Sequence, residues 1–342
     1  MEHSNHVRKE NRDISISDIW SAKKKISSLL HKTPLIESYI LSEKIGRPVY
    51  LKLENTHNTG SFKVRGAANK ILSLSEEEKK RGVVTFSTGN HGLAVAHVAK
   101  KLGIEAVICI SNRVPKAKID SLKRIGATIE IYGDSQDAAG ERCYQLEREK
   151  GMTVVPPFDD PYVIAGQGTI GLELLEDVPD LTDVIIPLSG GGLLSGISLT
   201  LKSNDPGIKI TGVSMEQSAV MYESLRAGKP VQLEEQYTLA DSLLGGIGLA
   251  NRYTFRLVQQ LMDDIILIPE KEIAGSMAFM MDHHRMIMEG AAATSIAALL
   301  DDQFTPQKGP IVVIISGNNV DLSVVQDILH NYSGKDITKH TR

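Results

Sequence analysis

The stretch Asp183-Val-Ile-Ile-Pro-Leu-Ser-Gly-Gly-Gly-Leu-Leu-Ser-Gly196 joins a β-branched run to three successive glycines and an apolar helix. The run predicts a buried strand, and the glycines predict a tight turn that exposes backbone N–H groups where the helix begins. Such a helix N-terminus attracts an anion, because its N–H groups and its dipole carry partial positive charge. The chain has no GxxxxGK[ST] motif, which favours a cofactor phosphate over ATP. The alternative to a phosphate site is a flexible tight turn without a bound anion.

The alternation of short strands and helices continues on both sides of this stretch. Most of the strands lack polar alternation, which is typical of strands covered on both faces. A capping box at Ser75 and Glu78 and an N-cap at Asp160 followed by Pro161 predict helix starts. The fold expected is α/β, with mainly parallel open sheets and helices on both faces. The predicted strands are 49–54, 83–87, 105–110, 128–132, 153–158, 183–188, 209–215, 264–269 and 311–316.

Composition limits the class of protein. At ~150 residues per domain, 342 residues predict about two domains. Thirty-eight Lys and Arg against 42 Asp and Glu leave a net charge of −4, which argues against a nucleic-acid partner. The apolar runs are too short for a membrane span, and the polar N-terminus lacks the apolar region of a secretory signal. Two cysteines, Cys109 and Cys143, make a disulfide framework implausible, so the cytoplasm is the expected setting.

Twelve of the 29 glycines fall in four groups, at 89–92, 166–171, 190–196 and 245–248. The second group spells GxGxxG, but it follows the N-cap Asp160 and not a strand, so helix packing is favoured over a dinucleotide site. His283 and His284 are adjacent and therefore face different ways on a helix, which argues against a shared metal ion.

Polar or glycine-rich loops follow several predicted strands, where open α/β sheets bind ligands. The loop Ser87-Thr-Gly-Asn-His-Gly92 could hold an anion such as a substrate carboxylate. Lys63 lies between apolar neighbours just inside a helix start; a buried lysine can act as a Schiff-base nucleophile, although a solvated lysine is the alternative. Ser316-Gly-Asn-Asn319 follows the last strand.

Taken in this order, these segments resemble the fold-type-II, tryptophan-synthase-β-like pyridoxal-phosphate enzymes, and among them the serine/threonine dehydratases and serine racemases. The most specific pair is Gly60-Ser-Phe-Lys-Val-Arg-Gly-Ala67 with Ser87-Thr-Gly-Asn-His91. Stretches at 165–176, 214–217 and 240–248 look most like the ectoine and hydroxyectoine utilisation branch. The remaining matches are at 31–35, 52–55, 189–193 and 316–318, so the resemblance runs from about residue 30 to residue 320.

The resemblance implies a role for each matched residue. Lys63 would bind the cofactor covalently and then act as general base, Asn90 would bond the ring hydroxyl, and Ser316 would face the pyridine nitrogen. The cofactor-binding set would be Phe62, Lys63, Asn90, Ser189, Gly190, Gly191, Gly192, Leu193 and Ser316, of which 189–193 would cradle the phosphate. The substrate carboxylate would be held by Ser87, Thr88, Gly89, Asn90 and His91.

The implied reaction is α,β-elimination of water from a β-hydroxy amino acid, giving a 2-oxo acid and ammonia. The substrate would be threonine, serine or a hydroxyectoine-derived amino acid. A racemase and a catalytically silent pyridoxal-phosphate-binding protein are the alternatives. The resemblance further implies a homodimer, a larger domain of 1–54 and 156–342, and a smaller inserted domain of 55–155 that carries the substrate loop.

Several positions depart from the family pattern. Thr88 stands where racemases carry a serine that acts as acid and base, so either a second proton-transfer role or a binding role is open. His57 replaces a usual glutamine and Ser242 a usual glycine, which puts threonine specificity in doubt. Ser214 and Val220 stand where metal-binding relatives carry Glu and Asp, so no metal is expected at that site.

Overall fold

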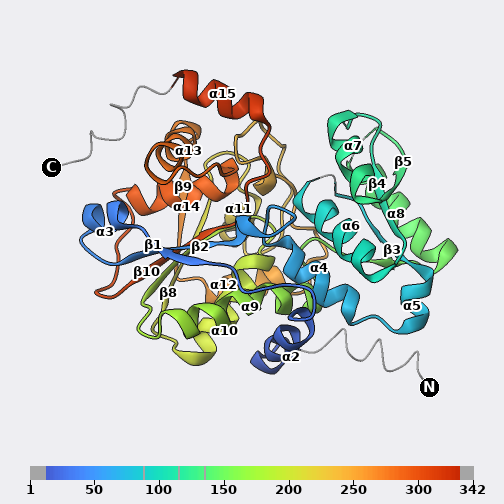
Figure 1. The fold of residues 1–342 in the computed structure, drawn as a ribbon, viewed down its shortest axis with the longest axis horizontal. Coiled ribbons are helices and arrows are strands. Elements are labelled where there is room, and N and C mark those ends of the chain that lie inside the picture. The colour runs from blue at the N-terminus through green and yellow to red at the C-terminus, as the bar shows by residue number, and fades with distance from the viewer. Residues whose placement is uncertain (1–12, 88, 115, 135, 332–342) are drawn as a thin grey trace.

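The computed structural model describes residues 13–87, 89–114, 116–134 and 136–331, which form two sheets surrounded by helices (Figure 1). The larger sheet has the order β1-β2-β10-β7-β8-β9 and the smaller one the order β5-β4-β3-β6. The strands of the larger sheet are β1 (Leu35–Glu37), β2 (Val49–Leu53), β7 (Asp183–Pro187), β8 (Lys209–Met215), β9 (Asp264–Ile268) and β10 (Ile311–Ile315). Those of the smaller sheet are β3 (Val83–Thr85), β4 (Ala106–Ile110), β5 (Thr128–Ile131) and β6 (Thr153–Val154).

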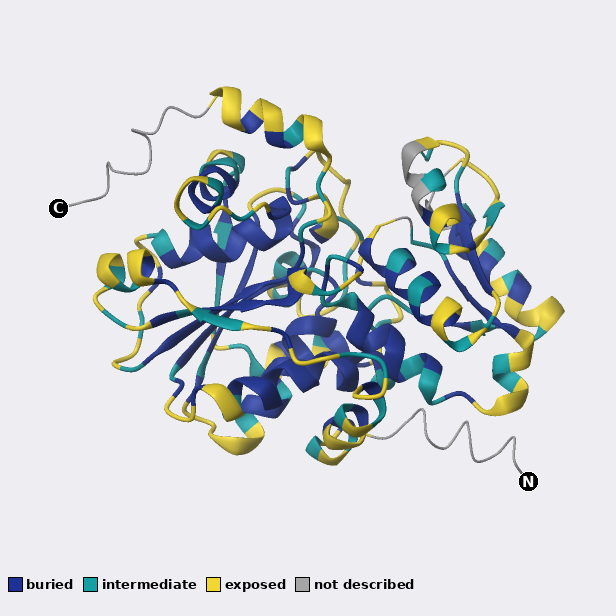
Figure 2. Ribbon diagram, viewed as in Figure 1, coloured by how far each residue is buried: buried dark blue, intermediate teal, exposed yellow. Residues whose placement is uncertain are grey.

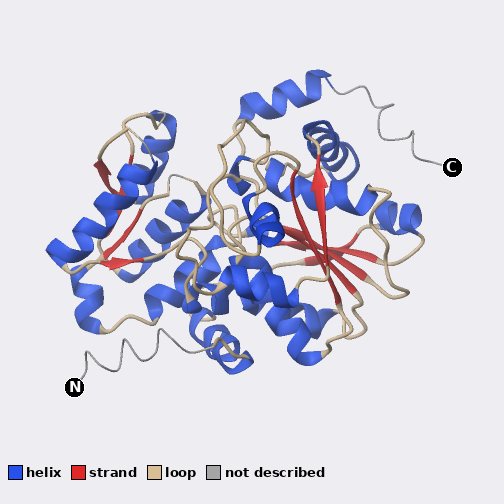
Figure 3. Cartoon of the chain, turned by 180° about the vertical axis from the view of Figure 1, so that it is seen from behind, coloured by secondary structure: helices blue, strands red, loops and turns tan. Residues whose placement is uncertain are grey.

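Every strand pair is parallel except the pair of β1 with β2. Helices cover both faces of the larger sheet, whose central strands are buried (Figures 2 and 3). In β10, Ile311, Val313 and Ile315 pack into one core, and Val312 and Ile314 pack into the core on the opposite face. Because side chains alternate across a strand and both faces are apolar, the strand has no polar alternation. The predicted α/β fold with mainly parallel sheets is confirmed.

None of the described helices is both long enough and apolar enough to cross a membrane. In chain order they fall into two sets, one before β6 and one after it. The first set comprises α2 (Ile16–Ile26), α3 (Tyr39–Ile45), α4 (Lys63–Leu72), α5 (Glu76–Arg81), α6 (Asn90–Leu102), α7 (Lys116–Ile125) and α8 (Gln136–Lys150). The second comprises α9 (Pro161–Asp177), α10 (Gly192–Asn204), α11 (Val220–Ala227), α12 (Thr254–Leu261), α13 (Glu270–His284), α14 (Gly290–Leu300) and α15 (Leu322–Asn331). Two short 3₁₀ turns are also present: η1 (Glu54–Thr56) lies between β2 and α4, and η2 (Asp241–Leu243) lies between α11 and α12.

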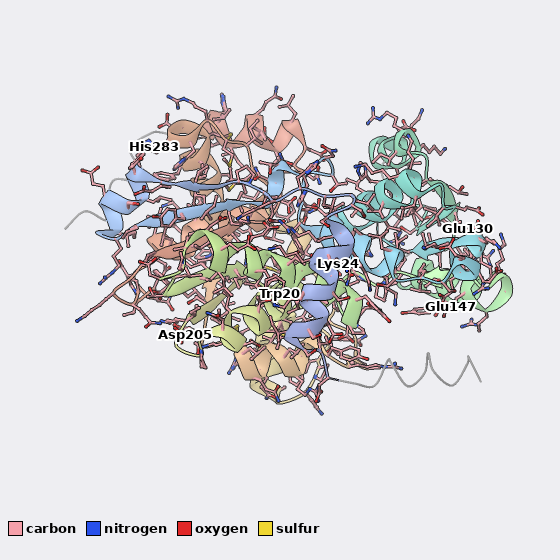
Figure 4. All side chains as sticks on the ribbon, turned by 60° about the horizontal axis from the view of Figure 1, so that its bottom comes forward. Trp20, Lys24, Glu130, Glu147, Asp205 and His283 are labelled. Carbon is pink, nitrogen blue, oxygen red and sulfur yellow. The ribbon has the colours of Figure 1, made fainter. Side chains whose placement is uncertain are left out.

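All nine predicted strands are present, although the one expected at 153–158 ends at Val154. The sequence did not predict β1, a three-residue edge strand whose residues are only partly buried or exposed. The helix starts are confirmed: Ser75 and Glu78 form a capping box, and Asp160 Oδ1 accepts the N–H groups of Tyr162 and Val163. His283 lies at the surface on α13 (Figure 4), and the ring of Phe279 packs against the rings of His283 and His284.

Helix α4 connects the two parts of the molecule, because it packs against α9 on one side and α6 on the other. Its residues Val64, Ala67 and Ile71 belong to the apolar core of the smaller sheet. The start of α4 is therefore fixed by both sheets. The domain boundaries at 54/55 and 155/156 stay a prediction.

The GxGxxG glycines lie inside α9 and let neighbouring helices approach closely. A Cβ on Gly166 would lie 2.6 Å from the carbonyl oxygen of Arg65 in α4, and one on Gly168 would lie 2.9 Å from that of Gly196 in α10. A Cβ on Gly171 would meet the Thr200 side chain at 2.7 Å. These contacts confirm helix packing and explain the motif without a nucleotide.

The substitution Gly166→Ala should lower the free energy of unfolding by about 1–3 kcal/mol, because the added methyl group meets backbone atoms that cannot move aside. Gly275→Ala is the matched control: it lies in α13 with open space at the Cβ position, so it should be neutral or stabilise the protein by up to about 1 kcal/mol. Urea unfolding of the two variants measures both. Equal stability would contradict the close approach of α4 and α9.

Candidate active site

The loop before α4 lies directly against the loop that follows β10. Ser61 forms a β-bridge with Gly317, and the Phe62 N–H donates to the Ser316 carbonyl oxygen at 3.0 Å. Gly60 has φ +71°, and a Cβ there would lie 2.6 Å from the Asn318 side-chain oxygen. Glycine is therefore required at position 60 both for its backbone conformation and for this contact. The two loops place Lys63 beside the carboxyl end of β10.

Lys63 is the first residue of α4, and its ammonium group is half-buried. Its Nζ donates a hydrogen bond to the Pro157 carbonyl oxygen at 2.8 Å and lies 5.3 Å from the centre of the Phe62 ring. Burial lowers the pKa of Lys63 to about 8, and the nearby Glu289 opposes that shift. A lysine with this pKa is partly neutral near pH 8, as a nucleophile or a general base must be. The half-buried side chain and its hydrogen bond to a backbone carbonyl favour the nucleophile interpretation over a solvated lysine.

The glycine loop after β7 lies on the other side of the 157–158 segment. Cβ atoms on Gly190 and Gly192 would lie 2.3 Å and 3.0 Å from atoms of Phe158. Gly191 has φ +84° and forms the N-cap of α10, and no side chain caps this helix. An uncapped N-terminus after a left-handed glycine presents N–H groups to an anion. The loop thus fits a cofactor phosphate, for which Ser189 and Leu193 flank the glycines.

Helix α6 offers a second N-terminus at which none of the described side chains forms a cap. It begins at Asn90 after Gly89, which supplies no capping side chain, and it runs for 13 residues. A Cβ on Gly92 would lie only 1.8 Å from the Ser87 carbonyl oxygen, so the Ser87 loop folds tightly over the start of the helix. Thr88, which the sequence placed in this loop, lies outside the described residues.

His91 lies in the first turn of α6, and its side chain is buried. Its Nε2 donates to the Val155 carbonyl oxygen at 2.8 Å. Burial, with the nearby charge of Lys63, lowers its pKa to about 3. A neutral ring committed to a backbone carbonyl brings no positive charge to a substrate carboxylate, so only the His91 backbone is suited to that predicted role.

Asn90 connects this helix to the carboxyl end of β10. Its Nδ2 lies 2.9 Å and 3.0 Å from the two carboxylate oxygens of Glu289, and the Asn319 side chain donates to its Oδ1. Its Nδ2 also lies 3.5 Å from the Ser242 hydroxyl. The Asn90 amide is thus held at both ends.

A buried ionic cluster fixes α4 behind Lys63. Arg65 donates from Nε to Glu54 at 2.7 Å and from Nη1 to Glu173 at 2.6 Å, and both carboxylates also bond its Nη2. Lys52 pairs with Glu173 at 2.6 Å. The cluster pairs two cations with two carboxylates, the His57 ring lies 3.3 Å from Glu54, and the Thr33 hydroxyl donates to Glu54.

The charges within the cluster stabilise one another. Burial would raise the pKa of Glu54, but the Arg65 guanidinium holds it well below the usual range of a glutamate. Burial lowers the pKa of Lys52, against the attraction of Glu173. Removing one partner of such a cluster leaves an uncompensated buried charge, which typically costs about 3–5 kcal/mol. The cluster makes the position of Lys63 depend on β2, α4 and α9 together.

The sequence indicated the loops but not all of the residues around them. It assigned no role to Arg65 or Glu173, whose pairing joins segments about a hundred positions apart. It also missed Glu289, which stands before an alanine-rich helix without any recognised motif. A charged residue inside an otherwise apolar stretch is the signal that could have drawn attention to it.

Comparison with known proteins places the whole arrangement in a family. Residues 26–317 match the family model described as pyridoxal-phosphate dependent enzyme. The chain is 41% identical to the L-threonine ammonia-lyase of Thermotoga maritima over 317 residues, covering 93% of this chain and 78% of that protein. It is also 41% identical to a catabolic L-threonine dehydratase of Staphylococcus aureus over 332 residues, covering 95% of each.

Solved structures agree with this match. Maize serine racemase superposes with a TM-score of 0.87 at 34% identity, over 93% of this chain and 98% of that one. The predicted fold type and cofactor are confirmed, whereas the comparisons do not show the ectoine-utilisation branch. From its sequence, its fold and the loops around Lys63, the chain belongs to the family of pyridoxal-phosphate-dependent enzymes.

Proposed function

We propose that the protein is a dehydratase and ammonia-lyase that converts a β-hydroxy amino acid into a 2-oxo acid and ammonia. The observation that carries the proposal is Lys63, a half-buried lysine of lowered pKa that bonds Pro157 beside the glycine loop and lies near His91 of α6. The relatives named for threonine dehydration, at 41% identity and over most of both chains, support the same reaction.

The two helix N-termini suit the two anions that the reaction brings together. The start of α10, with Gly191 in the left-handed region, would hold the cofactor phosphate. The start of α6 and the Ser87 loop would hold the substrate carboxylate. Because both anions are fixed, the α-carbon of the substrate is oriented toward one group of the protein, which we take to be Lys63.

Bound pyridoxal phosphate supplies the electron sink that acidifies the α-proton of an amino acid. Lys63, with its pKa near 8, would take that proton as general base. Ser316 is buried directly after β10, and its neutral hydroxyl would face the pyridine nitrogen. Unlike a carboxylate, this hydroxyl would not hold a proton on that nitrogen, which would suit departure of a β-substituent from the substrate.

The substrate is the finer part of the proposal. Threonine and serine follow from the named relatives, and a hydroxyectoine-derived amino acid follows from the resemblance at 165–176, 214–217 and 240–248. Ser242 and His57 support a departure from plain threonine specificity, because they replace residues that the family usually carries. A homodimer and a cytoplasmic setting stay predictions.

Lys63→Ala should abolish the visible absorption band of the bound cofactor and lower ammonia release by at least about 10²–10⁴-fold, the contribution expected of a general base. Borohydride treatment of the wild type should fix a pyridoxyl group to Lys63, located by peptide mass. Lys80→Ala, which removes an exposed lysine on α5, is the control and should retain both signals. Unchanged turnover by Lys63→Ala would exclude the mechanism. Ammonia release across threonine, serine, threo-3-hydroxyaspartate and hydroxyectoine-derived acids identifies the substrate.

A racemase is the second candidate, which the similarity to maize serine racemase and the hydroxyl of Thr88 support. We expect ammonia to form from L-serine faster than D-serine does. Chiral chromatography of the products, together with an ammonia assay, measures both rates in one incubation. Absence of D-serine would remove the second proton-transfer role of Thr88, whereas D-serine in excess of ammonia would make racemisation the main activity.

A further inference from the structure

Glu289 is a buried carboxylate in the centre of the candidate site to which the mechanism above gives no role. It forms the N-cap position of α14 and is 2% exposed. Its backbone N–H donates to the Gly317 carbonyl oxygen, and a Cβ on Gly317 would lie 2.7 Å from its Oε1. It therefore lies directly behind the loop that carries Ser316.

The groups that contact this carboxylate are hydrogen-bond donors. Asn90 Nδ2 lies within 3.0 Å of both oxygens, the Asn319 backbone N–H donates at 3.2 Å, and the Ser242 hydroxyl donates as well. An ionised carboxylate accepts all of these bonds, so the donors favour the charged form.

Burial and charge act in the opposite direction. Burial raises the pKa of Glu289 to about 7, and the carboxylate of Asp241 adds to the increase. The charged groups that face Glu289 are Asp241, from η2, and Lys63, from α4, whose own pKa Glu289 raises. The groups that contact Glu289 from α6 and from the loop after β10, which belong to Asn90 and Asn319, are uncharged. The proton is thus gained or lost close to neutral pH.

A protonated Glu289 needs a hydrogen-bond acceptor for its O–H. The Asn90 and Asn319 groups that contact it are N–H donors and cannot serve. The Ser242 hydroxyl can rotate to accept, and Ser242 is exposed, with its Oγ 3.4 Å from Asp241 Oδ1. Ser242 therefore connects the buried carboxyl group with the open side of the site.

We propose that Glu289 is a positioning residue that holds a proton behind Asn90 and exchanges it through the Ser242 hydroxyl. The hydrogen-bonding groups around the cofactor ring then have two states, one with Glu289 ionised and one with it protonated. The inference rests on the proposed function, because it takes Asn90 as the partner of the ring hydroxyl. When Glu289 is ionised, it accepts from Asn90 and adds negative charge beside the ring oxygen. When it is protonated, that charge is absent.

The test follows the visible absorption band of the protein loaded with pyridoxal phosphate from pH 5.5 to pH 9. The wild type should show a transition with a midpoint near pH 7 that Glu289→Gln removes. Asp241→Asn should move the midpoint to lower pH, because the repelling carboxylate is lost. Ser242→Ala should also shift the midpoint, because the ionised form loses a donor and the protonated form loses its acceptor. Both residues are exposed, so these two variants should fold even if Glu289→Gln does not.

The protein without cofactor gives an independent readout. Because the pKa of Glu289 in the folded state lies above its ordinary value of 4.5, its stabilising contribution is complete below about pH 4.5 and is lost as the pH rises through about 7. Glu289→Gln should therefore become more stable relative to the wild type over this range, as measured by thermal unfolding.

Asp183→Asn is the matched control. Asp183 is also a buried carboxylate whose pKa is raised by burial, but it stands at the opposite end of β7 from the site. Its replacement should change the pH dependence of unfolding and leave the absorption midpoint in place. The proposal is wrong if the wild type lacks the transition, if Asp241→Asn fails to lower its midpoint, or if Ser242→Ala leaves the midpoint unchanged. A normal transition without ammonia release would instead contradict the proposed function alone.

Discussion

The bidentate pairing of Arg65 with Glu54 and Glu173 is the constraint on which the site depends. Arg65 stands two positions after Lys63 in the first turn of α4, so whatever fixes its guanidinium also fixes the lysine. The carboxylates come from η1 and α9, and Lys52 from β2 completes the charge balance. In a dry interior such a cluster is stable only when all of its members are in place, because any one of them alone would be an uncompensated charge. The geometry of Lys63 is therefore determined by the packing of the larger part of the protein.

The segment from Pro157 to Asp160 has a comparable role on the other side of the lysine. The Pro157 carbonyl accepts from Lys63, and Phe158 packs against Gly190 and Gly192. Asp159 accepts the N–H groups at the start of α12, and Asp160 caps α9 and pairs with Lys70. Four successive residues thus tie the nucleophile, the glycine loop and two helix starts together. The sequence predicted a strand that continues to Phe158, but the structure ends it at Val154, and the residues that follow make these contacts instead.

The sequence predicted the fold well because its signals are local. Runs such as Ile311–Ile315 are apolar on both faces, and helix starts at Ser75 and Asp160 follow from capping chemistry within three residues. It also located the loops around Lys63, Gly190 and Ser316, since glycines and polar residues directly after a strand are visible in the chain. It could not predict the raised pKa of Glu289, because that shift arises from burial and from Asp241, which is distant in sequence. The surroundings of His91 were equally hidden, since its partner is a backbone carbonyl at residue 155.

The position of β10 has a consequence for how the chain acquires its structure. This last strand lies between β2 and β7 and pairs with both, so the larger sheet stays divided until residue 315 has been made. The smaller sheet, by contrast, uses only strands between residues 83 and 154 and is complete much earlier in synthesis. Until β10 has been made, β2 and β7 each present an unpaired backbone edge, which is the kind of surface that promotes aggregation. The arrival of β10 joins the two halves of the sheet and in the same step brings Ser316 and Asn319 to Lys63 and Asn90, so that sheet closure and assembly of the cofactor site are one event.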